Sequence, residues 1–311
     1  MKIAVMGAGG VGGYFGARLA ASGADVRFIA RGKHLEAMRK DGLRVSSDNG
    51  NLTIQPVQAT DDAARVGHCD VVMVAVKLWS TQDALDQAAP LVGPETAVVS
   101  FQNGVVAEEL IARKFGAART LGGVSNIAAV IEAPGVIRHT GTMAILQFNE
   151  LDGARSARVE ALKQACESAK IDTKVPDDIL KAIWEKFISL VALSSMTALT
   201  RLPVGAVRAD PDTRALTLAI MEEVVAVGRA KGVALDQDAV ATRMGWIDKL
   251  PPHMVASMLG DLERGNRLEL PWLAGNVVEL GQQLGVPTPA CQFIVAALKL
   301  YINGRPPMAR G

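Results

Sequence analysis

The first thirty residues hold a glycine-rich turn between a strand and a helix. Residues 2–6 have the apolar pattern of a strand, and the sequence GAGGVG fills positions 7–12. Residues 14–20 then continue as a helix, and residues 25–30 have the pattern of a second strand. In this βαβ context G-x-G-x-x-G is typical of a dinucleotide-binding turn, in which glycine permits the tight turn, close approach to a pyrophosphate and close helix–strand packing. The alternative is an ordinary glycine-rich turn. The predicted cofactor contacts are Gly7, Ala8, Gly9, Gly10, Val11 and Gly12.

The residue that follows the second strand indicates which dinucleotide is bound. An NAD site commonly has Asp or Glu there, about 20 residues past the glycines, to accept a hydrogen bond from the ribose 2′-hydroxyl. This chain has Arg31, with Lys33 close behind, and the nearest downstream acid is Glu36 in the next predicted helix. A guanidinium holds a 2′-phosphate through paired hydrogen bonds, so Arg31 favours NADP(H). The alternative is a solvated loop arginine.

Composition argues against several kinds of partner and site. At 311 residues, 49% hydrophobic and 21% charged, the chain suits two folded domains. A formal net charge of +1 with scattered basic residues gives no reason to expect a nucleic-acid partner. The three cysteines are widely spaced and the four histidines lack ligand spacing, so we expect no disulfide framework and no metal. No signal peptide or membrane-length apolar stretch is apparent, so we expect a cytoplasmic protein without a membrane segment.

The first half of the chain alternates strands and helices. Residues 71–76 and 96–101 are apolar runs typical of buried parallel strands, with a helix at 84–91 between them. Residues 122–148 are strand-rich, with turns expected at Pro134-Gly135 and Gly141, and we expect them to be edge strands that finish the sheet. A helix at 154–170 and a short strand at 171–175 complete this half.

After Pro176 the pattern becomes helical. Asp177 or Asp178 is the expected N-cap of a long helix that ends near residue 200. Further helices are expected near 211–231, 236–248, 252–264, 271–284 and 288–302. The predicted fold is therefore α/β: an N-terminal Rossmann-type doubly wound sheet (1–176) that binds NADP, followed by an all-helical C-terminal domain (177–311) for substrate and catalysis.

Four polar residues are candidates for a role in binding or catalysis. Lys77 and Asn103 follow the two buried strands, and ligands of open α/β sheets bind beyond the carboxyl ends of the strands. A plain Asn103-Gly104 turn is the alternative. Lys186 shares a helix face with apolar residues, so it either snorkels to the surface or is a buried ammonium with a lowered pKa. Glu269 precedes Pro271, a helix-start signal, but nothing internal to the sequence selects it as functional.

Several short stretches share a specific order and spacing, although each is weak alone. They are 7–12, Ala30-Arg31-Gly32-Lys33-His34-Leu35, Val76-Lys77, Gln102-Asn103-Gly104-Val105, Trp184-Glu185-Lys186, Ser257-Met258-Leu259, Arg267-Leu268-Glu269 and Gly285-Val286-Pro287-Thr288-Pro289. Together they resemble the ketopantoate reductase family (2-dehydropantoate 2-reductases) over essentially the whole chain.

The resemblance implies an NADP-dependent oxidoreductase and gives roles to individual residues. Lys186 matches the family's catalytic proton donor, and Glu269 matches an acid that contacts the nicotinamide ribose region and the reacting hydroxyl. The other implied contacts are Arg31 to the 2′-phosphate, Lys77 to the cofactor, Asn103 to cofactor and substrate, and Ser257 to the substrate.

The chain departs from the family pattern in the substrate pocket. Leu190 and Ser194 stand where the family commonly has Asn, four and eight residues after the lysine, and Met254 replaces an Asn before the serine. The usual Thr-Glu-Ile-Asp run reads 268-LELP-271. Ser194 is kept as a candidate substrate contact. Lost amides remove hydrogen bonds that discriminate strongly between analogues, so we expect an intact catalytic pair in a more apolar pocket.

The leading functional hypothesis is NADPH-dependent reduction of a 2-keto acid to a 2-hydroxy acid, with 2-dehydropantoate reduction to pantoate in pantothenate biosynthesis as the first candidate. The alternatives are a related carbonyl substrate, a β-hydroxyacid-type dehydrogenase, and a non-catalytic NADPH-binding sensor. The expected partner is a small-molecule substrate. Dimerisation through the helical domain would suit its size, although the sequence has no interface signature.

Overall fold

The computed structural model describes residues 1–306, and these form two compact units that divide between Ala182 and Ile183. The predicted domain boundary near residue 176 lies just before this division. The long helix α6 (Ile179–Thr200) begins ahead of the division, so its first turn belongs to the first unit.

The first unit is built on a ten-stranded mixed sheet with the order β4-β3-β9-β8-β7-β6-β1-β2-β5, and β10 pairs with β9 beside this path. Its strands are β1 (Lys2–Met6), β2 (Asp25–Ile29), β3 (Leu43–Ser47), β4 (Leu52–Ile54), β5 (Ala59–Thr60), β6 (Val71–Val74), β7 (Ala97–Ser100), β8 (Thr120–Ala133), β9 (Val136–Glu150) and β10 (Asp172–Lys174). Its helices are α1 (Gly10–Ala21), α2 (Gly32–Asp41), α3 (Thr81–Ala88), α4 (Ala107–Phe115) and α5 (Ala157–Ser168). The strands β7-β6-β1-β2 run parallel, which confirms the predicted doubly wound arrangement.

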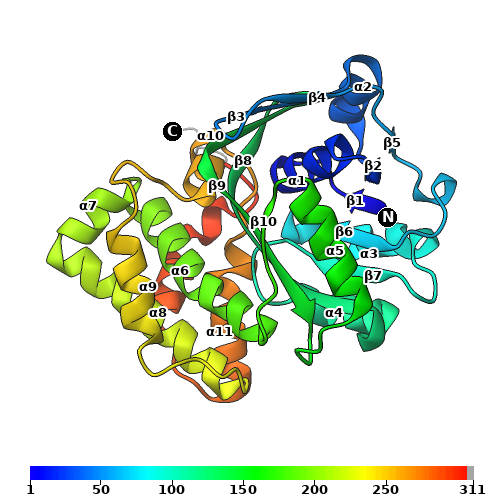
Figure 1. Cartoon of the computed structure of the whole chain (residues 1–311). Coiled ribbons are helices and arrows are strands. Elements are labelled where there is room, and N and C mark those ends of the chain that lie inside the picture. Colours follow the sequence, from blue (N-terminus) through cyan, green and yellow to red (C-terminus); the bar gives the residue numbers. More distant parts are fainter. Residues whose placement is uncertain (307–311) are drawn as a thin grey trace. The chain divides into compact units, whose positions relative to one another are not determined.

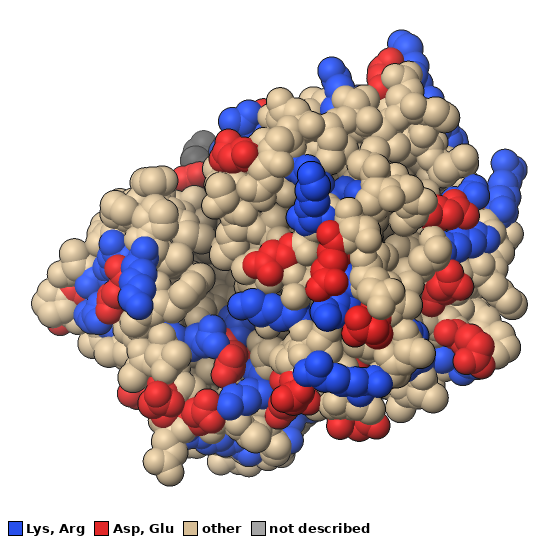
Figure 2. Space-filling view, viewed as in Figure 1, with Lys and Arg blue, Asp and Glu red and all other residues tan. Residues whose placement is uncertain are grey.

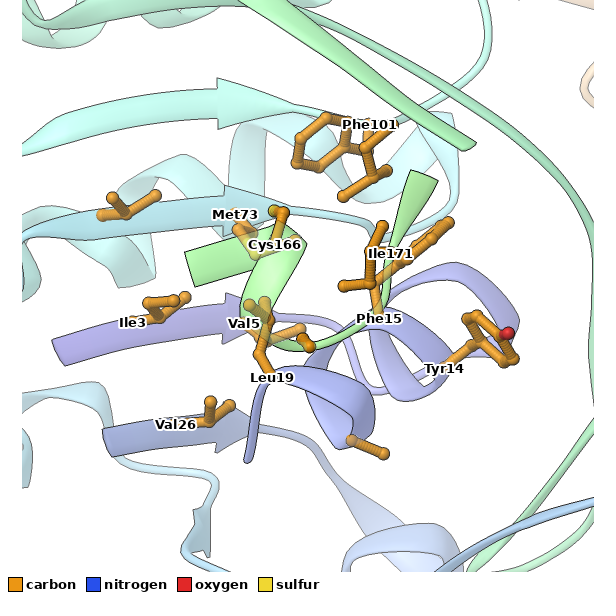
Figure 3. Close-up of a cluster of buried hydrophobic side chains, with 14 of the residues drawn as sticks. Ile3, Val5, Tyr14, Phe15, Leu19, Val26, Met73, Phe101, Cys166 and Ile171 are labelled. Carbon is orange, nitrogen blue, oxygen red and sulfur yellow. The ribbon is translucent and has the colours of Figure 1, made fainter. Parts of the chain in front are cut away.

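Alternate residues of β1 enter two separate cores, one on each face of the sheet, because successive strand side chains point to opposite faces. Ile3 and Val5 pack with α1 and α5 in one cluster (Figures 1 and 3), while Ala4 and Met6 pack with α3 and α4 in the other. All four of these side chains are buried. The apolar run of β1 therefore reflects a strand covered on both faces.

The long hairpin β8–β9 corrects one prediction. Its turn lies at Pro134-Gly135, as expected, but its strands are interior rather than at the edge, because β3 pairs in parallel with the first residues of β9 (136–139) and β4 extends the sheet further. The expected turn at Gly141 is also wrong. Gly141 lies inside β9, with a φ of +76°, where the register between β8 and β9 is irregular.

The second unit is helical, and no strand occurs in it among residues 183–306. Asp178 caps α6, since its carboxylate accepts a hydrogen bond from the Lys181 backbone N–H at 2.8 Å. The predicted helices appear as α8 (Pro211–Ala230), α9 (Ala239–Asp248), α10 (Ser257–Arg264), α11 (Ala274–Leu284) and α12 (Pro289–Leu298). Sequence reasoning missed the short helix α7 (Val204–Ala209).

The helix α6 is the main apolar element of this unit. Among residues 1–306 it alone is long and apolar enough, by length and composition, to cross a membrane, and 67% of its most apolar stretch is buried inside the protein. Gly228 of α8 lies so close that a Cβ there would be 2.7 Å from the ring of Trp184. Such burial is typical of a core helix.

On the face shown in Figure 2, Lys and Arg side chains are interspersed with Asp and Glu side chains, in keeping with a formal net charge of +1. The expectation that no polyanion binds this protein stays a prediction.

Candidate active site

The glycine-rich turn joins β1 to α1 at the carboxyl edge of the sheet. Gly7 has a φ of +96°, a conformation that L side chains rarely adopt, so glycine is required there. A Cβ on Gly12 would lie 2.1 Å from the Gly7 carbonyl oxygen, so this position also excludes any side chain. The sequence therefore allows α1 to pack directly against the turn.

Gly9 and Gly10 have different surroundings within the same turn. Gly9 is the N-cap of α1, and a Cβ there would have no heavy atom within 4 Å. A Cβ on Gly10 would lie 2.0 Å from the Ala129 carbonyl oxygen of β8, so Gly10 is needed for packing inside the protein. The open space at Gly9, beside the free N–H groups that begin α1, fits a pyrophosphate.

His34 forms a hydrogen bond with this turn, and sequence reasoning missed this contact. The Gly135 backbone N–H donates to Nδ1 of His34 at 3.0 Å, so Nδ1 carries no proton and the neutral ring donates from Nε2 to the Ala8 carbonyl oxygen at 2.8 Å. Burial lowers the pKa of His34 from 6.5, which favours this neutral form. No local pattern signals this role, because the two partners of His34 lie 26 and 101 residues away in the chain.

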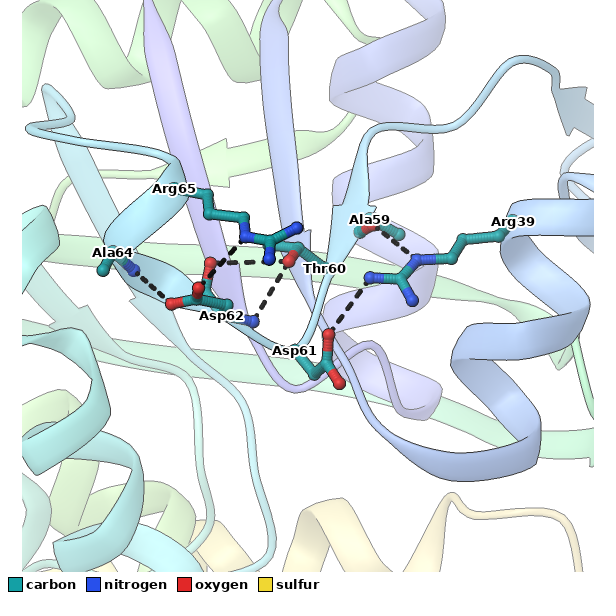
Figure 4. A network of polar contacts seen from close by, with 7 residues as sticks. All are labelled: Arg39, Ala59, Thr60, Asp61, Asp62, Ala64 and Arg65. Carbon is teal, nitrogen blue, oxygen red and sulfur yellow. Dashed lines mark hydrogen bonds and ion pairs between the residues drawn. The ribbon is translucent and has the colours of Figure 1, made fainter.

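Arg31 lies where β2 ends, as the N-cap residue of α2, and its side chain is exposed. Two acids that the sequence argument overlooked, Asp61 and Asp62, follow the neighbouring strand β5 at the same edge. Figure 4 shows that both carboxylates are engaged, Asp61 with Arg39 at 3.1 Å and Asp62 with Arg65 at 3.1 Å. Because Arg39 and Arg65 offset these two negative charges, the position beside Arg31 remains compatible with a phosphate group.

Lys77 and Asn103 follow β6 and β7, as predicted. Lys77 is exposed and begins the 3-10 helix Leu78–Ser80, with its ammonium 5.7 Å from the centre of the Trp79 ring. Asn103 is partly buried, and Gly104 after it has a φ of +87°. Both residues lie at the edge of the sheet that also carries the glycine turn.

Lys186 and Glu269 interact within the second unit. Lys186 lies on α6, and Glu269 immediately precedes the 3-10 helix Leu270–Trp272 and is only 7% exposed. Burial lowers the pKa of Lys186 from 10.5 to about 8, and the Glu269 charge opposes this shift. Glu185 pairs instead with Arg243 at 2.5 Å. The lysine can therefore carry or lose a proton near neutral pH.

The remaining candidates are less clearly grouped. Ser194 lies about two turns past Lys186 on α6, is 1% exposed, and its hydroxyl has no hydrogen-bond partner among residues 1–306. Leu190, one turn past Lys186, is partly exposed. Ser257 is exposed at the start of α10, and Met254 is partly buried in the segment before it. Among residues 1–306, no group of three or more His, Cys, Asp or Glu side chains could hold a metal ion.

Two family profiles together cover most of the chain. The profile described as Ketopantoate reductase PanE/ApbA matches residues 3–153, and the one described as Ketopantoate reductase PanE/ApbA C terminal matches residues 178–302. The chain belongs to the ketopantoate reductase family. It is 37% identical to a 2-dehydropantoate 2-reductase of Mesorhizobium japonicum, over 96% of this chain and 97% of that protein. It is also 32% identical to the "Uncharacterized oxidoreductase YkpB" of Bacillus subtilis, over 97% of this chain and 99% of that protein.

Solved structures agree with this membership of the ketopantoate reductase family. The 2-dehydropantoate 2-reductase of Geobacter metallireducens GS-15 matches with a TM-score of 0.89 and 30% identity, over 96% of this chain and 99% of that chain. A D-mandelate dehydrogenase solved with NADH and anilino(oxo)acetate matches with a TM-score of 0.89 at 20% identity, over 97% of this chain and 98% of that chain, which shows a shared fold. The protein is an NADP-dependent oxidoreductase of the keto-acid-reducing type.

Proposed function

We propose that this enzyme reduces 2-dehydropantoate to pantoate with NADPH, as a step of pantothenate biosynthesis. The observation that carries the proposal is the Lys186–Glu269 pair, in which a desolvated ammonium has a pKa of about 8 beside a buried carboxylate. A general acid works best when its pKa is near the operating pH. The full-length similarity to a protein named 2-dehydropantoate 2-reductase supports this substrate.

In the proposed reaction the ketone carbon gains a hydride and its oxygen gains a proton. NADPH, when bound, supplies the hydride. The Lys186 ammonium donates a hydrogen bond to the carbonyl oxygen, stabilises the negative charge that develops there, and delivers its proton from Nζ to the alkoxide. Glu269 keeps the lysine protonated against the effect of burial. We also propose that Glu269 contacts the nicotinamide ribose and the reacting hydroxyl.

The first unit, whose sheet ends at residue 174, is proposed to hold the cofactor. The N-terminus of α1 and the open side of Gly9 would receive the pyrophosphate, and Arg31 the 2′-phosphate. Lys77 and Asn103 would contact the cofactor, with Asn103 also reaching the substrate. In the helical part of the chain, Ser194 and Ser257 are the proposed substrate contacts.

A second candidate substrate is a 2-keto acid without the 4-hydroxyl group of 2-dehydropantoate. Leu190 favours it, because this partly exposed apolar side chain lies one turn past Lys186 and cannot hydrogen-bond a hydroxyl. An analogue with the same carbon skeleton but no hydroxyl is 3,3-dimethyl-2-oxobutanoate.

These proposals are separated by following NADPH absorbance with each keto acid, with NADH as the cofactor control. A kcat/KM for 2-dehydropantoate far above that for 3,3-dimethyl-2-oxobutanoate supports the first substrate, and similar values support the second. If NADPH binds tightly but no carbonyl in the panel oxidises it, the enzyme proposal is wrong and the protein is a sensor. A preference for NADH would contradict the role of Arg31.

A further inference from the structure

Gln102 is a buried polar residue whose side chain ties together two loops at the carboxyl edge of the sheet. It is 9% exposed and directly precedes Asn103. Its Nε2 donates to the Val76 carbonyl oxygen at 2.9 Å and to the Thr81 hydroxyl at 2.9 Å, while its Oε1 accepts from the Ser100 hydroxyl at 3.1 Å. Both amide hydrogens and the amide oxygen are therefore used.

These bonds fix the orientation of the amide group. Ser100 both donates to Oε1 and accepts from the Gln102 backbone N–H at 3.1 Å, so Gln102 is held against the last residue of β7. A flipped amide would set Oε1 against the Val76 carbonyl oxygen, and two acceptors cannot bond one another. A fully satisfied buried amide of this kind permits one arrangement of the chains that it joins.

The segment that Gln102 holds runs from Val76 to Thr81 and includes Lys77. Thr81 is 2% exposed, and its hydroxyl, which accepts from Gln102, also donates to the Leu78 carbonyl oxygen at 2.8 Å. Val76 also packs closely against the glycine turn, since a Cβ on Gly7 would lie 2.8 Å from a Val76 methyl group and 3.0 Å from the Val76 backbone nitrogen. One amide thus reaches the β6 loop, the β7 loop and, through Val76, the turn after β1.

We infer that Gln102 is a positioning residue, which sets the Lys77 and Asn103 loops against the glycine turn so that NADPH binds. This inference rests on the proposed function, in which those two residues contact the cofactor. Gln102 itself acts through the backbone that it orders. A binding site whose contacts lie on separate loops loses affinity when those loops are free to move, because ordering them then opposes binding.

The test is Gln102→Met, which keeps the length of the side chain and removes all three of its hydrogen bonds. We expect the NADPH Kd, from fluorescence titration, to rise about tenfold while kcat at saturating NADPH changes less than about threefold. Gln87→Met, at an exposed position on α3, is the matched control and should leave the Kd unchanged. If Gln102→Met does not fold, Thr81→Val removes one arm and should raise the Kd by about threefold.

A double-mutant cycle distinguishes positioning from general stability. In a Lys77→Ala background, Gln102→Met should raise the NADPH Kd less than it does in the wild type, because the contact that it positions is already gone. Equal effects in both backgrounds, or a lower Tm with an unchanged Kd, would overturn the inference. If Lys77→Ala weakens NADPH binding and Gln102→Met does not, the inference alone fails. If the wild type does not bind NADPH, the proposed function fails and the inference fails with it.

Discussion

Replacing Glu269 with Gln removes one charge beside Lys186 and keeps the shape of the side chain. Burial alone drives the pKa of Lys186 down, and the Glu269 charge is what limits the fall. We therefore expect Glu269→Gln to shift the alkaline limb of the kcat/KM profile for keto-acid reduction to lower pH. The sign follows from the role of Lys186, because the reduction needs its protonated form.

The magnitude follows from the pKa of the lysine. Its fall from 10.5 to about 8 corresponds to about 3 kcal/mol against the charged form, even with Glu269 present. A nearby opposite charge shifts a pKa by about 1 to 3, so without it Lys186 should titrate at about 7 or below. If the pKa falls to about 7, the protonated fraction at pH 8.5 drops from about a quarter to about 3%, an eightfold loss, whereas at pH 6 the loss by this route is below about 1.2-fold; a pKa below 7 makes both losses larger.

The assay is NADPH absorbance at subsaturating keto acid between pH 5.5 and 9.5, with the rate of the variant divided by that of the wild type at each pH. Glu279→Gln, an exposed acid on α11, is the matched control and should give a flat ratio. A loss of kcat/KM in Glu269→Gln that is the same at every pH would come from its proposed contacts with the ribose and the substrate. An alkaline limb that stays in place would refute the charge argument.

Three further predictions concern the cofactor edge. Gly9→Ala should keep the wild-type Tm, because its Cβ enters open space, but should lose NADPH affinity, because that space is proposed to hold the pyrophosphate. Gly12→Ala should lower the Tm, because its Cβ clashes with the Gly7 carbonyl oxygen. Equal Tm values for the two variants would contradict this prediction. Arg31→Ala should raise the KM for NADPH by about tenfold or more and leave that for NADH nearly unchanged; an equal rise for both would contradict the 2′-phosphate role. The pKa of His34 is lower in the folded state than its ordinary value of 6.5. The neutral ring therefore stabilises the fold fully above pH 6.5, and this stabilisation is lost as the pH falls below 6.5 and through the lower folded-state pKa. His34→Gln should therefore lose less Tm between pH 7.5 and 5 than the wild type does, and parallel curves would contradict this.

The local pattern of the sequence predicts the βαβ start and the helical second half well. The glycine spacing and the uniform burial of β6 are local properties, and so is the cap at Asp178. The place of β8 and β9 in the sheet was predicted wrongly, because it depends on the pairing of β3 with β9, between residues about 90 positions apart. No local pattern shows that two such segments meet.

The candidate site also depends on contacts between residues far apart in the sequence, which no local pattern predicts. The helical spacing of Lys186 is more typical of a snorkelling lysine than of a buried ammonium, and only the fold brings Glu269 into electrostatic contact with it. The contacts that His34 and Gln102 make with neighbouring loops also join distant segments, so their types alone could not suggest them. The roles of individual site residues stay predictions.

In the proposed mechanism Lys186 delivers the proton in an NADPH-dependent reduction of a keto acid. The direct measurement is turnover of Lys186→Ala with saturating NADPH and keto acid at pH 7, together with its NADPH Kd. We expect the kcat of this variant to be lower by about 10²- to 10⁴-fold, with a Kd close to that of the wild type. Near-normal turnover in this variant would show that Lys186 is not the proton donor.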